Sequence, residues 1–117
     1  MSESISQSLF LLGCSHQVAD LSAREKISLP SGSIDEFYDG LGKIKGIEEY
    51  LLLNTCNRTE IYAASKSNLS RNLIIQYLSK FRNLDPEFLN RYSYQRSNHE
   101  VVSHLFEVAS GIDSQMV

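Results

Sequence analysis

Cys56 is the residue with the clearest capacity for chemistry, because it stands among polar side chains and beside a cation. The local sequence reads Asn54-Thr55-Cys56-Asn57-Arg58. A cysteine that only fills space behaves as a small hydrophobe and more often sits inside an apolar run. A thiol next to a fixed positive charge favours its thiolate form, which is the nucleophile. The pattern therefore makes Cys56 a candidate nucleophile and leaves a packing role open.

Two short strands are expected to hold this thiol in place. An apolar run, 50–53, leads into the polar segment, and a second run that contains Ile and Tyr, 60–64, leads out of it. Runs of this length separated by Asn and Thr are typical of strands joined by a turn. Cys56 is thus predicted at the tip of a β-hairpin, with Arg58 in the turn beside it.

The remaining chain alternates between strand and helix patterns. Capping-box spacing predicts three helix starts, and apolar residues at helical spacing predict a fourth helix. In order, the elements follow the βαββαβ plan of an α+β ferredoxin-like sandwich, an antiparallel sheet with helices on one face, plus a C-terminal helix. Residues 1–7 are expected to be disordered. Strands are predicted over 8–13, 49–53, 59–65 and 91–96, and helices begin near 22, 33, 69 and 98.

Composition indicates one globular domain, 1–117, with an ordinary core. Of 117 residues, 42% are hydrophobic and 21% are charged, and the formal net charge is −3, which is typical of a globular chain. That acidic balance argues against a protein that holds nucleic acid by charge alone. The N-terminus lacks the basic segment of a signal peptide, and no apolar run is long enough to span a membrane. A cytoplasmic location is the expectation.

Two cysteines, Cys14 and Cys56, do not form a disulfide framework, and a reducing compartment is the better interpretation. With His16 and His104 they would supply four potential zinc ligands. Their spacing matches no compact zinc motif, because structural sites usually bring ligands in close pairs. No metal is expected.

Three ordered stretches resemble the glutamyl-tRNA reductase family, and together they extend over nearly the whole chain. The resemblance implies the N-terminal catalytic domain of an NADPH-dependent oxidoreductase of tetrapyrrole (porphyrin) biosynthesis. The stretches are Gly13-Cys14-Ser15-His16 with Arg24-Glu25-Lys26, then Thr55-Cys56-Asn57-Arg58-Thr59-Glu60-Ile61-Tyr62, then Ser103-His104-Leu105-Phe106-Glu107-Val108-Ala109-Ser110-Gly111-Ile112-Asp113-Ser114.

The resemblance also implies a reaction. The Cys56 thiolate would attack the ester of glutamyl-tRNA(Glu) and form a thioester, which the full-length enzyme reduces with NADPH to glutamate-1-semialdehyde. This sequence has no Gly-rich nucleotide fingerprint, so NADPH is expected on a domain missing from this chain. The family further implies a homodimer for the full-length enzyme, a monomer for this fragment, contact with glutamate-1-semialdehyde aminomutase and no membrane.

The resemblance assigns substrate binding to Thr55, Cys56, Asn57, Arg58 and Ser114. The planar fork of Arg58 would hold the substrate carboxylate in two hydrogen bonds. An ordinary surface charge is the alternative for Arg58, and Arg24 is then the next candidate for the carboxylate.

His104 is the second expected catalytic residue, because the family has an important histidine at this place. On residue type and position alone, it is more often a half-buried packing residue of the last helix. Two other functions remain open: a cysteine hydrolase with a Cys–His pair, and a non-enzymatic, non-reducing RNA-binding module. Labelling with glutamyl-tRNA separates them, since only a nucleophile captures the glutamyl group.

Overall fold

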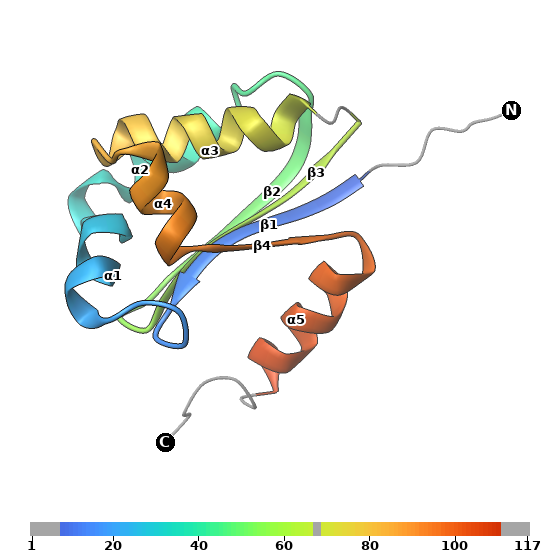
Figure 1. Cartoon of the computed structure of the whole chain (residues 1–117). Coiled ribbons are helices and arrows are strands. Elements are labelled where there is room, and N and C mark those ends of the chain that lie inside the picture. Colours follow the sequence, from blue (N-terminus) through green and yellow to red (C-terminus); the bar gives the residue numbers. More distant parts are fainter. Residues whose placement is uncertain (1–7, 67–68, 111–117) are drawn as a thin grey trace, which may run out of the picture.

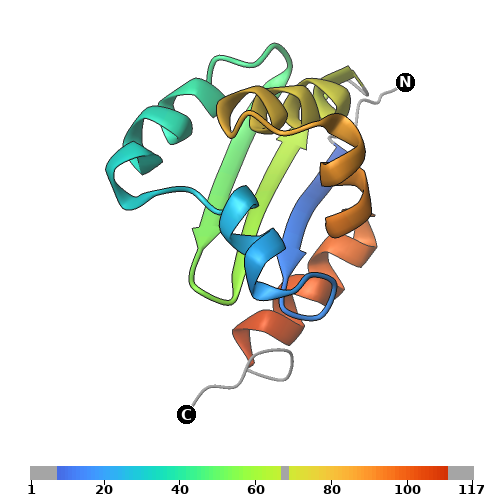
Figure 2. The same cartoon turned by 60° about the vertical axis from the view of Figure 1, so that its left-hand side comes forward.

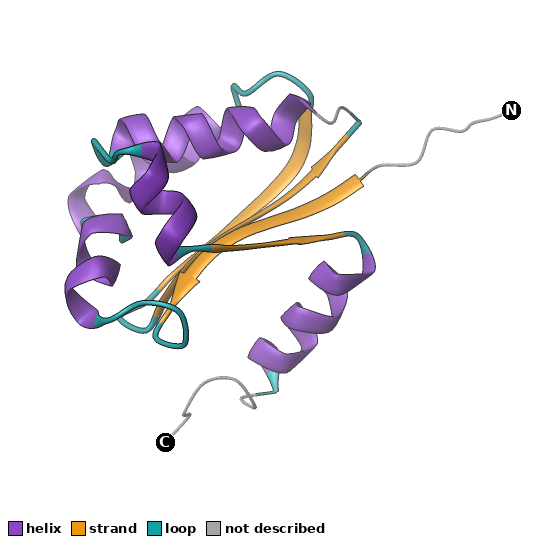
Figure 3. Ribbon diagram, viewed as in Figure 1, coloured by secondary structure: helices purple, strands orange, loops and turns teal. Residues whose placement is uncertain are grey.

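The molecule is built on one antiparallel sheet of four strands, against which the helices pack (Figures 1 and 3). The computed structural model describes residues 8–66 and 69–110, so the expectations for residues 1–7 and for Ser114 lie outside the described residues. The strand order is β2-β3-β1-β4, and each neighbouring pair is antiparallel. This arrangement confirms the expected ferredoxin-like plan. The strands are β1 (Ser8–Ser15), β2 (Ile47–Asn54), β3 (Arg58–Ser65) and β4 (Tyr94–Ser97).

Helices cover both faces of this sheet, and α5 is separate from the others (Figure 1). Side chains alternate along a strand, so β1 sends Phe10, Leu12 and Cys14 into the larger core beneath α1 to α4. The residue between the first two, Leu11, faces the other way and packs with Val101 of α5. The helices are α1 (Leu21–Ile27), α2 (Ile34–Leu41), α3 (Leu69–Phe81), α4 (Pro86–Tyr92) and α5 (His99–Ala109), with a 3-10 turn η1 (Ser31–Ser33) before α2.

The element boundaries differ from the sequence prediction where a local cap or a longer strand decides them. Strand β1 continues to Ser15, so Cys14 lies within the strand and not after it. The side chain of Asp20, not of Ser22, caps α1 by accepting a hydrogen bond from the Ala23 backbone N–H at 2.9 Å. The fourth strand starts only at Tyr94, because the residues before it form the helix α4, which Asp85 caps by accepting the Glu87 backbone N–H.

Helix α5 buries less surface than its apolar pattern predicts. Val101 is 5% exposed, but Leu105 is 40% exposed and Ala109 also faces solvent. The helix packs on the sheet through one turn, and among the described residues no further layer covers its outer side. Its start is tied to β1, since the Asn98 side chain accepts a hydrogen bond from the Leu9 backbone N–H at 3.2 Å. No described helix is long and apolar enough to cross a membrane.

Candidate active site

The tip of the β2–β3 hairpin holds the thiol, as the sequence predicts. From Glu49 onward, β2 pairs with β3 in one register up to the pair Asn54 and Thr59. Three residues lie between the two strands. The loop is closed by its own hydrogen bonds, because the Thr55 backbone N–H donates to the Arg58 carbonyl oxygen at 2.8 Å. The Thr55 hydroxyl oxygen accepts the Arg58 backbone N–H at 3.2 Å. Cys56 is exposed at this stiffened tip.

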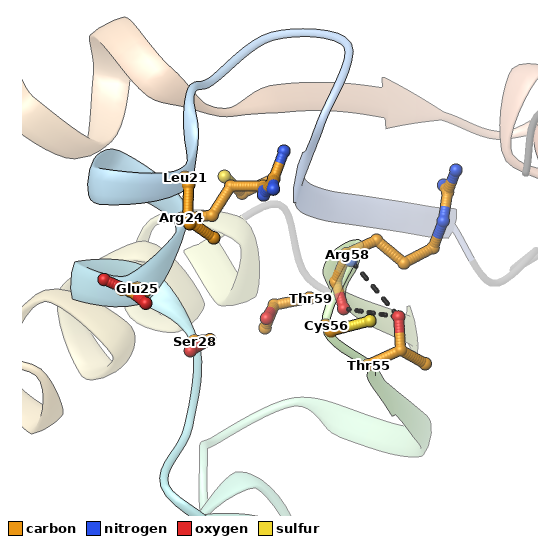
Figure 4. A pocket seen from close by; sticks show the side chains of 9 residues that line it. Leu21, Arg24, Glu25, Ser28, Thr55, Cys56, Arg58 and Thr59 are labelled. Atoms are coloured by element: carbon orange, nitrogen blue, oxygen red, sulfur yellow. Dashed lines mark hydrogen bonds between the residues drawn. The ribbon is translucent and has the colours of Figure 1, made fainter.

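Helix α1 lies next to the tip of the β2–β3 hairpin (Figure 2). A pocket beside Cys56 is formed between these two elements (Figure 4). Its volume is about 140 Å³. Helix α1 contributes Arg24, whose Nη1 donates to the Ala19 carbonyl oxygen at 3.3 Å. Arg24 and Cys56, which are far apart in sequence, therefore line the same pocket. Its lining residues are Cys14, Leu21, Arg24, Glu25, Ser28, Thr55, Cys56, Arg58 and Thr59.

The other cysteine has a different environment. Cys14 is 2% exposed and belongs to the core beneath the helices. Burial raises the pKa of the Cys14 thiol to about 11, although the positive charge of Arg24 opposes the shift. A buried thiol with a raised pKa is inert, which agrees with a packing role for Cys14.

Arg58 is buried and is not the ordinary surface charge that was the alternative to a carboxylate clamp. It is the first residue of β3, it is 3% exposed, and its Nη1 lies 3.0 Å from Oε2 of Glu60. Residues two apart on a strand share a face, which explains the pairing. In Figure 4 the Arg58 side chain runs away from Arg24 and Glu25. The Arg58 guanidinium therefore already has a buried carboxylate partner.

Glu60 is the residue that sequence reasoning missed. Its side chain is completely buried and accepts four hydrogen bonds. Tyr62 donates to Oε1 at 2.6 Å, and the Tyr94 hydroxyl donates to Oε2. His104 Nε2 lies 2.6 Å from Oε2, the oxygen that also accepts the Arg58 guanidinium. The available signal was an acidic residue inside an apolar strand, because such a residue is seldom buried without partners.

The hydrogen bonds around Glu60 keep it charged. Burial favours the neutral acid, but hydrogen bonds from Tyr62, Tyr94 and His104 outweigh it and lower the pKa of Glu60 below its usual range. The pKa of Tyr94 is raised strongly by its own burial and by the neighbouring carboxylate. The buried group is thus a carboxylate with donors on both oxygens, as a buried charge requires.

His104 and Cys56 lie in two groups that Arg58 connects. The His104 side chain is 12% exposed, and its ring centroid is 5.5 Å from that of Tyr94. His104 does not line the pocket beside the thiol, but it shares Oε2 of Glu60 with Arg58, which does. The structure thus brings the tetrapeptide 55–58 to the hairpin tip and joins His104 to its last residue.

Asn57 is the member of the tetrapeptide that interacts least with the pocket. Its side chain is exposed, and its carbonyl oxygen accepts the His16 backbone N–H at 3.1 Å. That bond ties the hairpin tip to the segment after β1. Ser114 lies outside the described residues.

The zinc alternative gains no support from the described part of the chain. Cys14 faces the core beneath α1 to α4, whereas His104 reaches the sheet from α5 on the other face. Among the described residues no three His, Cys, Asp or Glu side chains gather closely enough to hold a metal ion.

Comparison with known proteins gives one consistent result. Residues 12–117 match the family model described as glutamyl-tRNA(Glu) reductase, N-terminal domain. Proteins named glutamyl-tRNA reductase from Idiomarina loihiensis and Prochlorococcus marinus are 32% and 36% identical over 88% and 89% of this chain. In both cases the match occupies 24% of the relative, so the chain spans about a quarter of these curated proteins.

Solved structures agree with the sequence comparison. The glutamyl-tRNA reductase from Methanopyrus kandleri superposes with a TM-score of 0.67 at 27% identity, over 93% of this chain and 24% of that one. A putative antibiotic biosynthesis monooxygenase from Nitrosomonas europaea superposes with a TM-score of 0.52 at 9% identity, over 84% of this chain and 93% of that one. The second likeness is one of fold alone.

Proposed function

We propose, since this chain belongs to the family of glutamyl-tRNA reductase N-terminal domains, that its Cys56 receives the glutamyl group of glutamyl-tRNA as a thioester. The observation that carries the proposal is the exposed thiol at a closed hairpin tip, beside a pocket that Arg24 lines. The family's role in tetrapyrrole biosynthesis supplies the context. Catalysis by the full-length enzyme, its dimerisation and its contact with an aminomutase are part of the same proposal.

The transfer step is a substitution at the ester carbonyl. The Cys56 sulfur forms a bond to the carbonyl carbon, and the bond from that carbon to the 3′ oxygen of the tRNA breaks. The departing oxygen takes a proton and leaves as the hydroxyl of free tRNA. Sulfur suits this step because a thiolate is nucleophilic near neutral pH, and because a thioester accepts a hydride more readily than an oxygen ester does.

Substrate recognition is assigned to the tetrapeptide 55–58 together with Ser114. Arg58 would hold the side-chain carboxylate of the glutamyl group. A guanidinium carries five N–H donors in a planar fork, so the proposal has Arg58 bridge Glu60 and the substrate. Arg24, on the opposite wall of the pocket, is the alternative clamp.

His104 is the proposed acid–base group for the proton that the leaving oxygen requires. Its position on α5, half-buried and hydrogen-bonded to Glu60, supports a fixed orientation. A positioned group of this type typically contributes about 10²–10⁴-fold to a rate.

The described residues do not fit NADPH. A dinucleotide site needs a strand, a Gly-rich turn and a helix that holds the pyrophosphate. Here Gly40 and Gly42 lie against the hydroxyl ends of Tyr77 and Tyr50, which occupy the space next to each glycine. The later reduction, with NADPH as hydride donor, is therefore proposed for the full-length enzyme, and no step in this chain is routed through the cofactor.

Labelling with radioactive glutamyl-tRNA tests the proposed function. The parent chain is expected to retain label that hydroxylamine releases, because hydroxylamine cleaves thioesters. Cys56→Ser is expected to lose the label, and Cys14→Ser, as the matched control, to keep it. Label retained by Cys56→Ser contradicts the assignment.

The same assay separates the alternative functions. A cysteine hydrolase would release free glutamate in many turnovers without lasting label. An RNA-binding module would bind charged and uncharged tRNA equally and capture nothing on sulfur. Either pattern in the parent chain contradicts the proposal.

A further inference from the structure

Glu60 is the point at which three separate elements meet. Its carboxylate accepts hydrogen bonds from Arg58 and Tyr62 of its own strand, from Tyr94 of β4 and from His104 of α5. The last two lie 34 and 44 residues away in sequence. These are the charged and titratable groups that the described residues direct at Glu60. One buried carboxylate thus sets the relative positions of two groups, Arg58 and His104, that the proposed reaction uses.

We propose that Glu60 is a positioning residue for glutamyl transfer, which fixes the His104 ring with one proton on Nε2, so that a second proton, taken from solvent onto Nδ1, is the one that passes to the leaving 3′ oxygen. The inference rests on the proposed function, because it gives His104 a task within that reaction. It adds a residue, a tautomer and a specific ring nitrogen that the resemblance does not assign.

Hydrogen-bond chemistry determines the tautomer. An ionised carboxylate can only accept hydrogen bonds, and the hydrogen bonds around Glu60 lower its pKa despite burial. A ring nitrogen 2.6 Å from Oε2 must therefore carry a hydrogen. A neutral imidazole has one protonated nitrogen, so the lone pair of neutral His104 lies on Nδ1. The Tyr94 ring packs beside the imidazole, with the two ring planes inclined at 51°.

A purely structural Glu60 would have different consequences. Its removal would weaken folding and slow every step through misplacement, independently of His104. A positioning role through His104 instead requires that Glu60→Gln, whose amide oxygen still accepts a hydrogen bond from Arg58, has little further effect once the imidazole is gone. This difference is measurable even though both roles arise from the same contacts.

The first test uses the parent chain and needs no Glu60 variant to fold. Histidine is labelled with ¹⁵N, and the His104 signals are assigned by their loss in His104→Asn, with His16 and His99 as internal references. Neutral His104 is expected to show a protonated Nε2 and an unprotonated Nδ1. A protonated Nδ1, or an averaged signal from both tautomers, overturns the inference.

The second test is a double-mutant cycle on single-turnover glutamyl transfer. Glu60→Gln is expected to slow transfer by a factor close to that of His104→Asn, within about 10²–10⁴-fold. The double variant should be at most a few-fold slower than either single variant, because both remove one function. If the rate losses of the two single variants multiply in the double variant, the inference is overturned. Glu87→Gln, an exposed change of the same kind on α4, is the control and should transfer at the parent rate.

Outcomes for the inference and for the proposed function are distinguishable. If the parent captures no glutamyl group, the proposed function fails and the positioning role fails with it. If the parent captures label and folded Glu60→Gln matches its rate, the function stands and the inference is overturned. If Glu60→Gln does not fold, Glu60→Asp retains the charge but shortens the reach, and it should lose the fixed tautomer and the transfer rate together. A fixed tautomer at reduced rate contradicts the inference.

Discussion

At the scale of single residues, the two cysteines differ in burial. Cys56 is exposed at the hairpin tip, whereas Cys14 is buried in the core with its pKa raised to about 11. Only the thiolate reacts with alkylating agents. The two side chains are chemically identical. We therefore expect them to differ in reactivity because one is exposed and the other is buried.

Iodoacetamide at neutral pH is expected to modify Cys56 and to leave Cys14 unmodified in the native chain. Denaturation should expose Cys14 and allow both to react. Mass spectrometry of the intact protein gives the number of alkylated cysteines, and mass spectrometry of its peptides identifies which cysteine is alkylated. Equal rates for both thiols in the native state would show that the core around Cys14 opens readily.

Arg58→Lys is expected to impair glutamyl transfer severely, although the charge is kept. A lysine ammonium lacks the planar fork that holds one carboxylate of Glu60 and one of the substrate. Loss of one member of a desolvated charge pair costs about 2–5 kcal/mol, or roughly 30- to several-thousand-fold at about 1.4 kcal/mol per decade. Single-turnover labelling measures the effect. The rate of transfer from glutaminyl-tRNA should fall much less on the same substitution.

Three controls make the Arg58 test specific. Arg91→Lys, at an exposed site on α4, should behave as the parent. Circular dichroism should show an intact fold in Arg58→Lys, and iodoacetamide should alkylate its Cys56 within a few-fold of the parent rate. If Arg58→Lys transfers glutamate normally, the carboxylate is held elsewhere, and Arg24 is the next residue to change.

At the scale of elements, the close approach of β1 to the Glu60 network depends on Gly13. A Cβ added there would lie 2.7 Å from Cε1 of Tyr94 and 2.9 Å from Cγ of Glu60. Gly13 pairs with both of these residues in the sheet register. Its missing side chain is what allows the tyrosine and the carboxylate to meet over the strand.

Gly13→Ala is expected to destabilise the fold by about 1–3 kcal/mol, the usual cost of overpacking, and to slow transfer by displacing Glu60. Urea unfolding and single-turnover labelling measure the two effects. Gly32→Ala is the matched control, because a Cβ at that position would meet nothing within 4 Å. Parent-like stability in Gly13→Ala would mean that the Tyr94 ring moves aside at little cost.

At the scale of the whole molecule, stability should depend on pH through the Glu60 carboxylate. The pKa of Glu60 is lower in the folded chain than its usual value, which is about 4.3 in an unfolded chain. The unfolded state therefore binds more protons in the interval between the two values. Stability from this group is complete above the unfolded pKa and is lost as pH falls through the folded pKa.

The free energy of unfolding is expected to fall with acid below about pH 4.3 more steeply in the parent than in Glu60→Gln, which has no carboxylate to protonate. Urea titrations at a series of pH values measure the slope. Glu87→Gln, the exposed control, should keep the parent slope. Equal slopes for parent and Glu60→Gln would show that the network contributes no proton linkage.

Except for α4, the order of elements, the hairpin and the thiol at its tip followed from the sequence alone. These features depend on hydrophobic periodicity and on turn-forming residues within about ten residues of one another, so short stretches of sequence are enough to predict them. Element boundaries shifted where a nearby cap decided them, as Asp20 does for α1. The family resemblance supplied Cys56, Arg58 and His104 as expected site residues.

Only the tertiary structure decided how those residues are connected. Arg58 looks exposed in a turn but is buried against Glu60, and Glu60 gains His104 from a helix 44 residues away on the second face of the sheet. No local pattern encodes which face α5 covers, because Val101 packs against Leu11 of β1 and Tyr62 of β3, and the pairing of these two strands brings those residues together. A buried carboxylate is stable only with its donors in place. The donors to Glu60 come from distant parts of the chain, so the tertiary structure is needed to identify them.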